Sequence, residues 1–91
     1  MDRILALKSD DKDNVATIFA DTKVGQVVQI KDKQGNTESI VALSNIPYGH
    51  KIAVKSIKKG SKILKYGEEI GLATADIIAG DYVHTHNLDS A

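Results

Sequence analysis

The sequence has no cysteine, no tryptophan, and only one phenylalanine and one proline. Without cysteine, no disulfide framework can supplement the hydrophobic core, and this absence agrees with a cytoplasmic protein. A domain of 91 residues buries only roughly 60–65% of the surface that its unfolded chain exposes, so its core is thin. Because aromatic residues are scarce, that core must be built mainly from Ile, Val, Leu and Ala.

The sequence also lacks net charge and long apolar runs. Lys and Arg total 12, as do Asp and Glu, so the formal net charge is zero. A general nucleic-acid or membrane-surface binder would be basic, which argues against both kinds of partner. No apolar stretch approaches the ~20 residues of a membrane span, and the apolar run at residues 4–7 is too short for a signal peptide. We expect one domain over residues 1–91 and a cytoplasmic location.

A glycine followed by a polar residue and then a nearly alternating apolar run occurs four times, at Gly25, Gly49, Gly60 and Gly80. Three of these glycines have an isoleucine three residues earlier. Because positive φ costs glycine little, each glycine predicts a tight turn that leads into a short strand. Other strands are expected at residues 4–7, 15–20 and 39–43, with a polar hairpin loop over residues 31–38. A helix is the alternative for residues 15–20, although β-branched residues favour a strand there.

This pattern predicts a mostly β fold. Many short strands with turn residues between them are typical of a small closed or partly closed barrel. Closure hides strand edges that would otherwise aggregate. We expect at most one or two short helices, and residues 73–78 are where one could form.

Two of the three histidines, His84 and His86, lie in a segment, residues 82–87, that is rich in strand-forming residues. In a strand they would share one face with Tyr82, while Val83 and Thr85 would pack into the barrel. Two imidazoles on one face can converge on a metal ion or on a substrate anion. The alternative is two solvent-exposed histidines, since most metal sites need a third ligand from elsewhere.

Two other segments carry groups suited to chemistry. Gly49 allows the backbone to approach a ligand closely, and the adjacent His50 and Lys51 are cationic or proton-transferring groups. The alternative is an ordinary turn and strand. Further along the chain lie Lys65, Tyr66 and Glu68. These three side chains could act as acid–base or anchoring groups, and the alternative is a charged hairpin without a site.

The motifs I-P-x-G-H-K at residues 46–51, K-Y-G at 65–67 and V-H-x-H-N at 83–87 occur in that order after Asp13-Asn14-Val15. Together they resemble the N-terminal SAF-type domain of the altronate/galactarate dehydratase family. The resemblance runs from about residue 13 to residue 87 and implies a small β-clip-like barrel. It also implies the small subunit or N-terminal domain of a hydro-lyase, which removes water from an aldonate or aldarate to give a 2-keto-3-deoxy acid.

The resemblance implies a large catalytic subunit as partner, without which this chain would be inactive, and a sugar acid as substrate. It implies a divalent metal, Fe²⁺, contributed mainly with the large subunit, and it allows homo-oligomers. The residues assigned on this basis are His50, Lys51, Lys65, Tyr66 and Glu68 for catalysis, Gly49 and Asn87 for substrate binding, and His84 and His86 for the metal.

Two other functions stay open on the sequence alone. One is the small, or alpha, subunit of a sulfolactate sulfo-lyase, which would use the same α-proton abstraction with sulfite leaving in place of water. The other is a carbohydrate-binding or assembly module without catalysis. The sequence does not choose among the sugar acids or identify the base, since specificity would reside largely in the partner.

Overall fold

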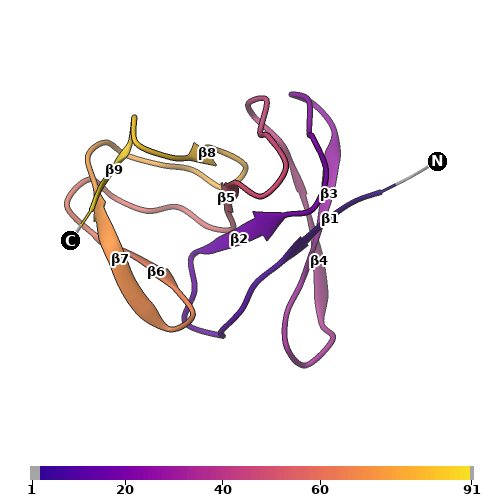
Figure 1. Ribbon diagram of the computed structural model, residues 1–91, viewed down its shortest axis with the longest axis horizontal. Helices are drawn as coiled ribbons and strands as arrows, with labels where there is room; N and C mark the ends of the chain where they lie inside the picture. The colour runs from indigo at the N-terminus through magenta and orange to yellow at the C-terminus, as the bar shows by residue number, and fades with distance from the viewer. Residues whose placement is uncertain (1–2, 91) are drawn as a thin grey trace.

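The chain forms an all-strand structure. The computed structural model describes residues 3–90, and within them it contains nine strands and no helix (Figure 1). The strands are β1 (Ile4–Leu7), β2 (Val15–Ile18), β3 (Val27–Lys31), β4 (Thr37–Val41), β5 (Lys51–Ala53), β6 (Lys62–Lys65), β7 (Glu68–Ala73), β8 (Tyr82–Val83) and β9 (Leu88–Ser90). The strand predicted at residues 4–7 is confirmed as β1, and the strand predicted at residues 15–20 is β2, which ends at Ile18. The strand predicted at residues 39–43 is β4, which begins two residues earlier and ends at Val41, so the polar loop predicted over residues 31–38 is limited to residues 32–36.

These strands form two sheets. The larger has the order β4-β3-β1-β2-β5-β8, and the smaller has the order β6-β7-β9. β1 runs parallel to β3, whereas the other paired strands of residues 3–90 are antiparallel. Figure 1 shows β1, β3 and β4 on one side of the molecule and β6, β7 and β9 on the other, with β2 and β5 between them. The larger sheet curls into a partly closed barrel, as the sequence predicts.

The core has two parts, and β2 and β5 contribute to both. Because successive side chains in a strand point to opposite faces, Ile18 and Ile52 enter one part while Val15 and Ala53 enter the other. The first part is completed by Ala6, Ala16, Val28, Ile30, Ala42, Ile46 and Val54. The second part is completed by Ile57, Ile63, Ala73, Ile77 and Val83.

The four predicted glycine turns are present. The φ angles are 90°, 83°, 86° and 99° at Gly25, Gly49, Gly60 and Gly80, and a strand begins two residues after each glycine. Gly80 has a further constraint, since a Cβ there would collide with the carbonyl oxygen of Val41. The local prediction is therefore confirmed at all four positions.

The residues three positions before the glycines bond one another through their backbones, and these bonds join the four turns in two pairs. Thr22 and Ile46 exchange backbone hydrogen bonds of 2.9 and 2.8 Å, and Ile57 and Ile77 exchange two of 2.8 Å. All four side chains are buried. The isoleucines that recur in the sequence thus hold the turns to one another across the core.

The possible helix at residues 73–78 does not form. Ala73 is the last residue of β7, the amide of Thr74 bonds the carbonyl of Asn87 at 3.0 Å, and Ile77 bridges Ile57. These long-range bonds use backbone groups that a helix would need for itself. Among residues 3–90, no helix long and apolar enough to cross a membrane is present.

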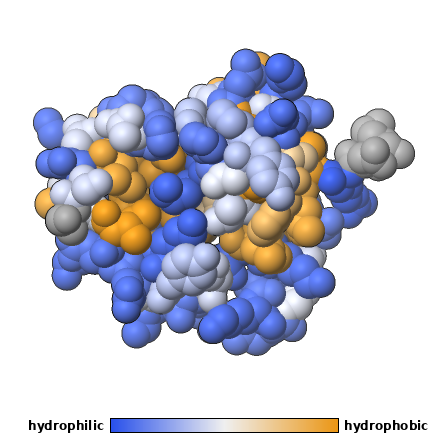
Figure 2. All heavy atoms as spheres, in the orientation of Figure 1, coloured by the Kyte–Doolittle hydropathy of each residue, from blue (hydrophilic) through white to orange (hydrophobic). Residues whose placement is uncertain are grey.

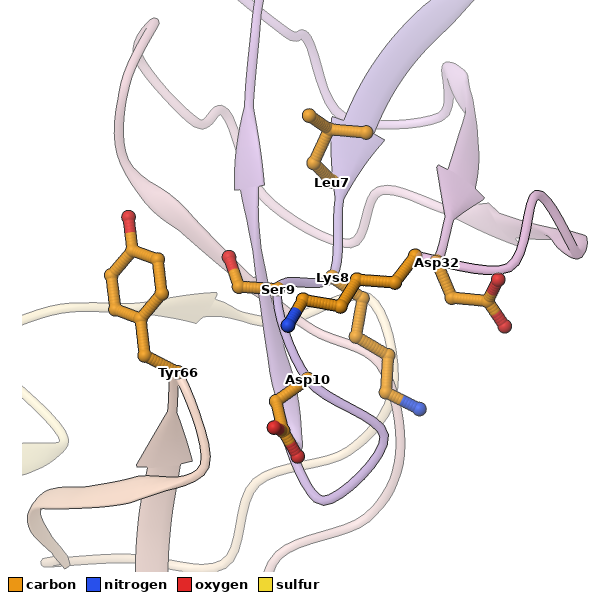
Figure 3. A pocket seen from close by; sticks show the side chains of 7 residues that line it. Leu7, Lys8, Ser9, Asp10, Asp32 and Tyr66 are labelled. Carbon is orange, nitrogen blue, oxygen red and sulfur yellow. The ribbon is translucent and has the colours of Figure 1, made fainter.

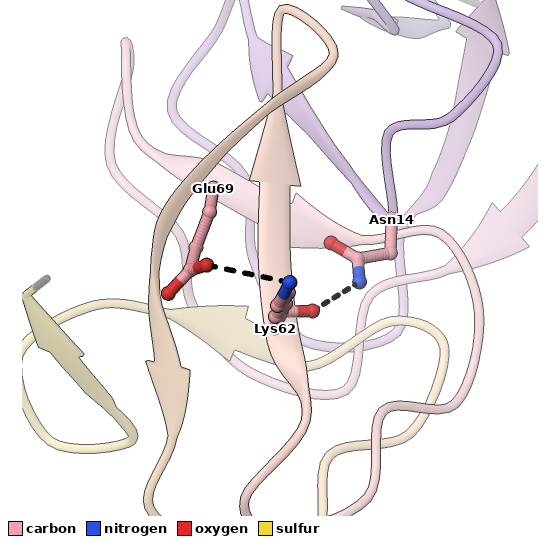
Figure 4. A network of polar contacts seen from close by, with 3 residues as sticks. All are labelled: Asn14, Lys62 and Glu69. Carbon is pink, nitrogen blue, oxygen red and sulfur yellow. Dashed lines mark hydrogen bonds and ion pairs between the residues drawn. The ribbon is translucent and has the colours of Figure 1, made fainter.

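Asn14 ties the two sheets together. Its side-chain nitrogen donates to the carbonyl of Lys62 at 2.9 Å, and its side-chain oxygen accepts from the amide of Leu64 at 2.8 Å. Its own carbonyl accepts from the amide of Val54 at 2.9 Å. Figure 4 shows Asn14 beside Lys62, whose ammonium lies 3.8 Å from the Glu69 carboxylate. A residue just before β2 is thereby bonded to β6 in the smaller sheet.

Asp13 makes the second tie. Its fully buried carboxylate accepts from the amides of Gly67 at 2.8 Å, Tyr66 at 2.9 Å and Asp10 at 3.1 Å. Tyr66 and Gly67 form the β6–β7 turn with φ angles of 58° and 73°. Positive φ at both central residues is the geometry of a tight hairpin turn, and Asp13 holds that turn from the loop just before β2.

Candidate functional site

Three histidines and a tyrosine gather around β8. The Tyr82 ring centroid lies 5.6 Å from that of His50, 5.5 Å from that of His84 and 5.4 Å from that of His86. The His50 and His84 centroids are 4.9 Å apart. The structure therefore brings together all three histidines of the sequence, with Tyr82 in the middle.

Two local features position this group, which we call the histidine cluster (His50, Tyr82, His84 and His86). His50 follows the Gly49 turn, whose amide bonds the carbonyl of Ile18 at 2.8 Å and so fixes the turn to β2. The β5–β8 register then pairs Ile52 with Tyr82, which places the Tyr82 ring beside the start of β5. The Tyr82 hydroxyl lies 2.7 Å from His50 Nδ1, within hydrogen-bonding distance.

The strand predicted over residues 82–87 is wrong beyond Val83, because the chain turns at His84. The Asn87 side chain accepts from the amide of His84 at 3.0 Å and donates to the carbonyl of Tyr82 at 2.9 Å. These bonds close a turn and bury Asn87. Val83 is buried as expected, but Thr85 is exposed. His84 and His86 still meet the same Tyr82 ring, through the turn and not through strand alternation.

The two predicted substrate-binding residues, Gly49 and Asn87, differ in whether they are accessible to a ligand. Gly49 is exposed, and a Cβ placed there would have no neighbour within 4 Å, so its backbone is open to a ligand. Both polar ends of the Asn87 side chain bond backbone groups of its own turn. Asn87 thus shapes the backbone that carries His84 and His86.

Lys51 faces away from the histidine cluster. It pairs with Val83 across the β5–β8 ladder, and directly paired residues point to the same face, so Lys51 lies on the side of the second core. Burial lowers the pKa of Lys51, and the nearby charge of Lys65 lowers it further. Lys65 lies with its ammonium 5.3 Å from the centroid of the Tyr66 ring. The structure therefore associates Lys51 with Lys65 and separates it from its neighbour His50.

Tyr66 lies at a different end of the molecule, and Glu68 follows it as the first, exposed residue of β7. Tyr66 borders a hollow of about 500 Å³ with Leu7, Lys8, Ser9, Asp10, Asp32 and Lys33. Figure 3 shows its ring standing to one side of this hollow, with Ser9 between it and Lys8 in this view. In Figure 1 the β6–β7 turn and β8 are at opposite edges. The structure does not bring Tyr66 to the histidine cluster.

The metal expectation can be compared with the donors present. Among residues 3–90, no group of three or more His, Cys, Asp or Glu side chains is arranged to hold a metal ion. In the histidine cluster, His50 Nδ1 already lies against the Tyr82 hydroxyl. The described residues therefore do not fit a complete metal site.

Sequence reasoning missed three residues that organise these regions, namely Tyr82, Asp13 and Asn14. Tyr82 was expected only to share a face with the histidines, and its contact with His50 depends on a β5–β8 register that no local pattern reveals. The side chains of Asp13 and Asn14 bond backbone groups of β6 and of the β6–β7 turn, which lie 48 to 54 residues further along the chain. Their place in the Asp13-Asn14-Val15 motif was the one available indication.

Comparison with known proteins gives the family. Residues 4–91 match the model of the altronate/galactarate dehydratase SAF domain. The chain belongs to this family. It is 40% identical over 75 residues to altronate dehydratase of Escherichia coli (strain K12), a match that covers 82% of this chain and 14% of that protein. It is 37% identical over 81 residues to altronate dehydratase of Bacillus subtilis (strain 168), covering 89% of this chain and 15% of that protein.

A third relative has a different organisation. The chain is 46% identical over 48 residues to (2R)-sulfolactate sulfo-lyase subunit alpha of Paracoccus pantotrophus, a match that covers 53% of this chain and 72% of that subunit. The SAF domain thus spans about one seventh of the two dehydratases but most of the sulfo-lyase subunit. It is a part of a larger protein or assembly in each of these relatives.

Proposed function

We propose that this chain is the small subunit, or N-terminal domain, of a sugar-acid hydro-lyase that resembles altronate dehydratase. Together with a large catalytic subunit it would remove water from an aldonate or aldarate to give a 2-keto-3-deoxy acid. The observation that carries the proposal is the family match over residues 4–91, supported by the two altronate dehydratases that align with more than four fifths of the chain. A cytoplasmic location stays a prediction.

The histidine cluster is the proposed point of contact with substrate. Elimination of water requires loss of the proton α to the carboxylate, help for the departing hydroxyl, and groups that stabilise the growing negative charge on the carboxylate. His50 and His84 are half-buried, His50 directly follows the exposed Gly49, and His86 is exposed. We assign these imidazoles to the carboxylate and the departing hydroxyl, and the base to the large subunit.

Lys51 and Lys65 form a second proposed element of the site. Their mutual repulsion and the burial of Lys51 would be relieved by an anion bound between them. Such an anion could be the second carboxylate of an aldarate or an acidic side chain of the large subunit. Tyr66 and Glu68 stay catalytic candidates, although they would need the partner to bring substrate to the β6–β7 turn. Fe²⁺ also stays a proposal, with its ligands supplied mainly by the large subunit.

The outer face of the larger sheet is the proposed surface for the large subunit. Leu5, Phe19, Val27 and Val41 are 40–50% exposed there, and Tyr48 extends the surface through an edge contact with Phe19. Val27 and Val41 are directly paired across β3 and β4, and the Phe19 amide bonds the carbonyl of Leu5. Figure 2 shows apolar surface over the part of the molecule that holds β1, β3 and β4. A contiguous apolar face of this kind marks interaction sites.

Charge substitutions test this surface. Val41→Lys and Leu5→Lys should abolish co-purification with the large subunit, because each introduces an unpaired charge into an apolar interface. The matched control is Leu72→Lys, which changes an equally exposed leucine on β7 in the other sheet. Loss of binding in the control alone, or in none of the three variants, would refute the assignment of the surface.

A sulfo-lyase alpha subunit is the second candidate. The supporting observation is that the match covers 72% of the sulfo-lyase protein from Paracoccus pantotrophus, which is named as subunit alpha. The chemistry would share α-proton abstraction, with sulfite as the leaving group. The third candidate, a carbohydrate-binding or assembly module, differs from both because it predicts no role for the chain in turnover.

One experiment separates the three. The chain is co-purified with the large dehydratase chain of the same organism, and the complex is assayed with altronate, galactarate and sulfolactate in the presence of added iron. Formation of a 2-keto-3-deoxy acid supports the proposal, and sulfite release supports the second candidate. If the complex converts none of the three substrates, or if the large chain is fully active alone, the result supports the third candidate, a module without a role in turnover. The purified small chain should be inactive by itself.

A further inference from the structure

Tyr82 contacts every histidine of the chain, yet no catalytic, substrate or metal role has been assigned to it. Its ring is stacked on His84 at an interplanar angle of 10° and is tilted by 53° against His86. Its hydroxyl reaches His50 Nδ1 at 2.7 Å. The residue is half-buried, with its body packed against the first core. A small change at Tyr82 would therefore reach His50 through the hydroxyl and the other two histidines through the ring.

The chemistry of the two groups sets the direction of the hydrogen bond. A neutral imidazole has one protonated nitrogen and one acceptor nitrogen. The phenol is a strong O–H donor, and its oxygen is a poor acceptor because its lone pair is delocalised into the ring. The favoured arrangement therefore has the Tyr82 hydroxyl donating to His50 Nδ1. The proton of neutral His50 is then on Nε2.

We propose that Tyr82 is a positioning residue that fixes both the ring orientation and the tautomer of His50, so that neutral His50 offers an Nε2–H donor. A ring held in this way binds an anionic or oxygen-bearing ligand such as a carboxylate or a departing hydroxyl, and it does not act as the base. Only the identity of that ligand rests on the proposed function. The orientation and the tautomer of His50 follow from contacts within this chain.

The test uses the isolated chain and needs no partner. Nitrogen-15 NMR of the histidine rings distinguishes a protonated from an unprotonated ring nitrogen, and a His50→Gln variant identifies the His50 signals. At about pH 8, where an ordinary histidine is neutral, His50 should show an unprotonated Nδ1 and a protonated Nε2. The Tyr82 hydroxyl proton should be observable through its slow exchange, with a nuclear Overhauser contact to His50.

Two tyrosine variants separate the hydrogen bond from general structure. Tyr82→Phe should shift the His50 ring nitrogens toward the average of two exchanging tautomers while leaving the His84 signals in place, because the ring that stacks on His84 is retained. Tyr48→Phe is the matched control: Tyr48 is 62% exposed, and the change should leave all three histidines unaltered. The wild-type spectrum decides the question even if Tyr82→Phe fails to fold.

The results have distinct meanings. A protonated Nδ1 in the wild-type chain, or identical His50 signals in wild type and Tyr82→Phe, would overturn the proposal. In the assembled enzyme, Tyr82→Phe should lower kcat/KM by about 10-fold to 100-fold, by analogy with the loss of a partner that orients a metal-bound histidine. If the assembly has no dehydratase activity, the proposed function fails, while the NMR result still decides the role of Tyr82.

Discussion

Replacement of Asp13 by Ala should be among the most destabilising single changes in this protein. The fully buried carboxylate accepts amide hydrogen bonds of 2.8, 2.9 and 3.1 Å, and two of these amides belong to the β6–β7 turn. Each hydrogen bond to a charged group contributes about 1.5–3 kcal/mol, and a buried donor left unpaired costs about 1–3 kcal/mol. Tyr66 is exposed, so water can reach part of the turn, which places the expected loss at about 3 kcal/mol.

This loss is large for so small a domain. A stability of roughly 0.05–0.15 kcal/mol per residue gives the 91-residue chain a total of about 5–14 kcal/mol. A loss of about 3 kcal/mol corresponds to a fall in Tm of roughly 12–24 °C at this size. The measurement is chemical and thermal unfolding of the isolated chain, followed by circular dichroism.

Asp32→Ala is the matched control for this prediction. Asp32 also accepts two backbone amides, those of Gln34 and Asn36 at 2.9 Å, but it does so in the exposed loop between β3 and β4. Because water replaces those bonds readily, the control should lose much less stability. If Asp13→Ala and Asp32→Ala prove equally mild, Asp13 does not hold the two sheets together.

Three further predictions concern the backbone and Lys51. Gly80→Ala should destabilise the chain far more than Gly25→Ala, although both have positive φ, because only at Gly80 does the new Cβ meet a carbonyl oxygen; equal Tm losses would contradict this. Tyr66→Asn should raise stability by up to about 1 kcal/mol, since asparagine tolerates the φ of 58° better, and a lower Tm would argue that the tyrosine ring itself stabilises the turn. The folded-state pKa of Lys51 is lowered, so the unfolded chain binds more protons between that pKa and about 10.4, and this group adds stability as pH rises through that window. Lys51→Met should remove this increment, and unfolding curves at about pH 7 and pH 10 that rise in parallel for variant and wild type would contradict it.

The parts of the fold that sequence could predict are local. The turns at Gly49 and Gly80 depend on the conformational freedom of glycine and on the residues next to it, and a strand follows each of them as expected. The same reasoning failed over residues 82–87, because the turn there depends on the Asn87 side chain bonding two backbone groups. The residue types in this segment favour a strand, and they do not reveal that the Asn87 side chain will bond backbone groups of the same segment.

The candidate site was predicted less completely, for the same physical reason. The three histidines do meet, but their meeting depends on the β5–β8 register, which is a long-range property. Adjacent residues were expected to act together at His50 and Lys51, whereas strand alternation sends Lys51 toward Lys65. Tyr66 was expected to act with these residues at one catalytic site, yet its amide bonds Asp13 in the β6–β7 turn, away from the histidine cluster.

The most direct test of the central claim is the double substitution His84→Ala/His86→Ala in the assembled enzyme, with complex formation and the rate of 2-keto-3-deoxy acid release measured on the same preparation. Both side chains lie on an exposed or half-buried turn, so the chain should still fold and bind its large subunit. If the histidine cluster serves the elimination, the rate should fall by about 100-fold or more. An intact complex that turns over sugar acid at the wild-type rate would contradict the account.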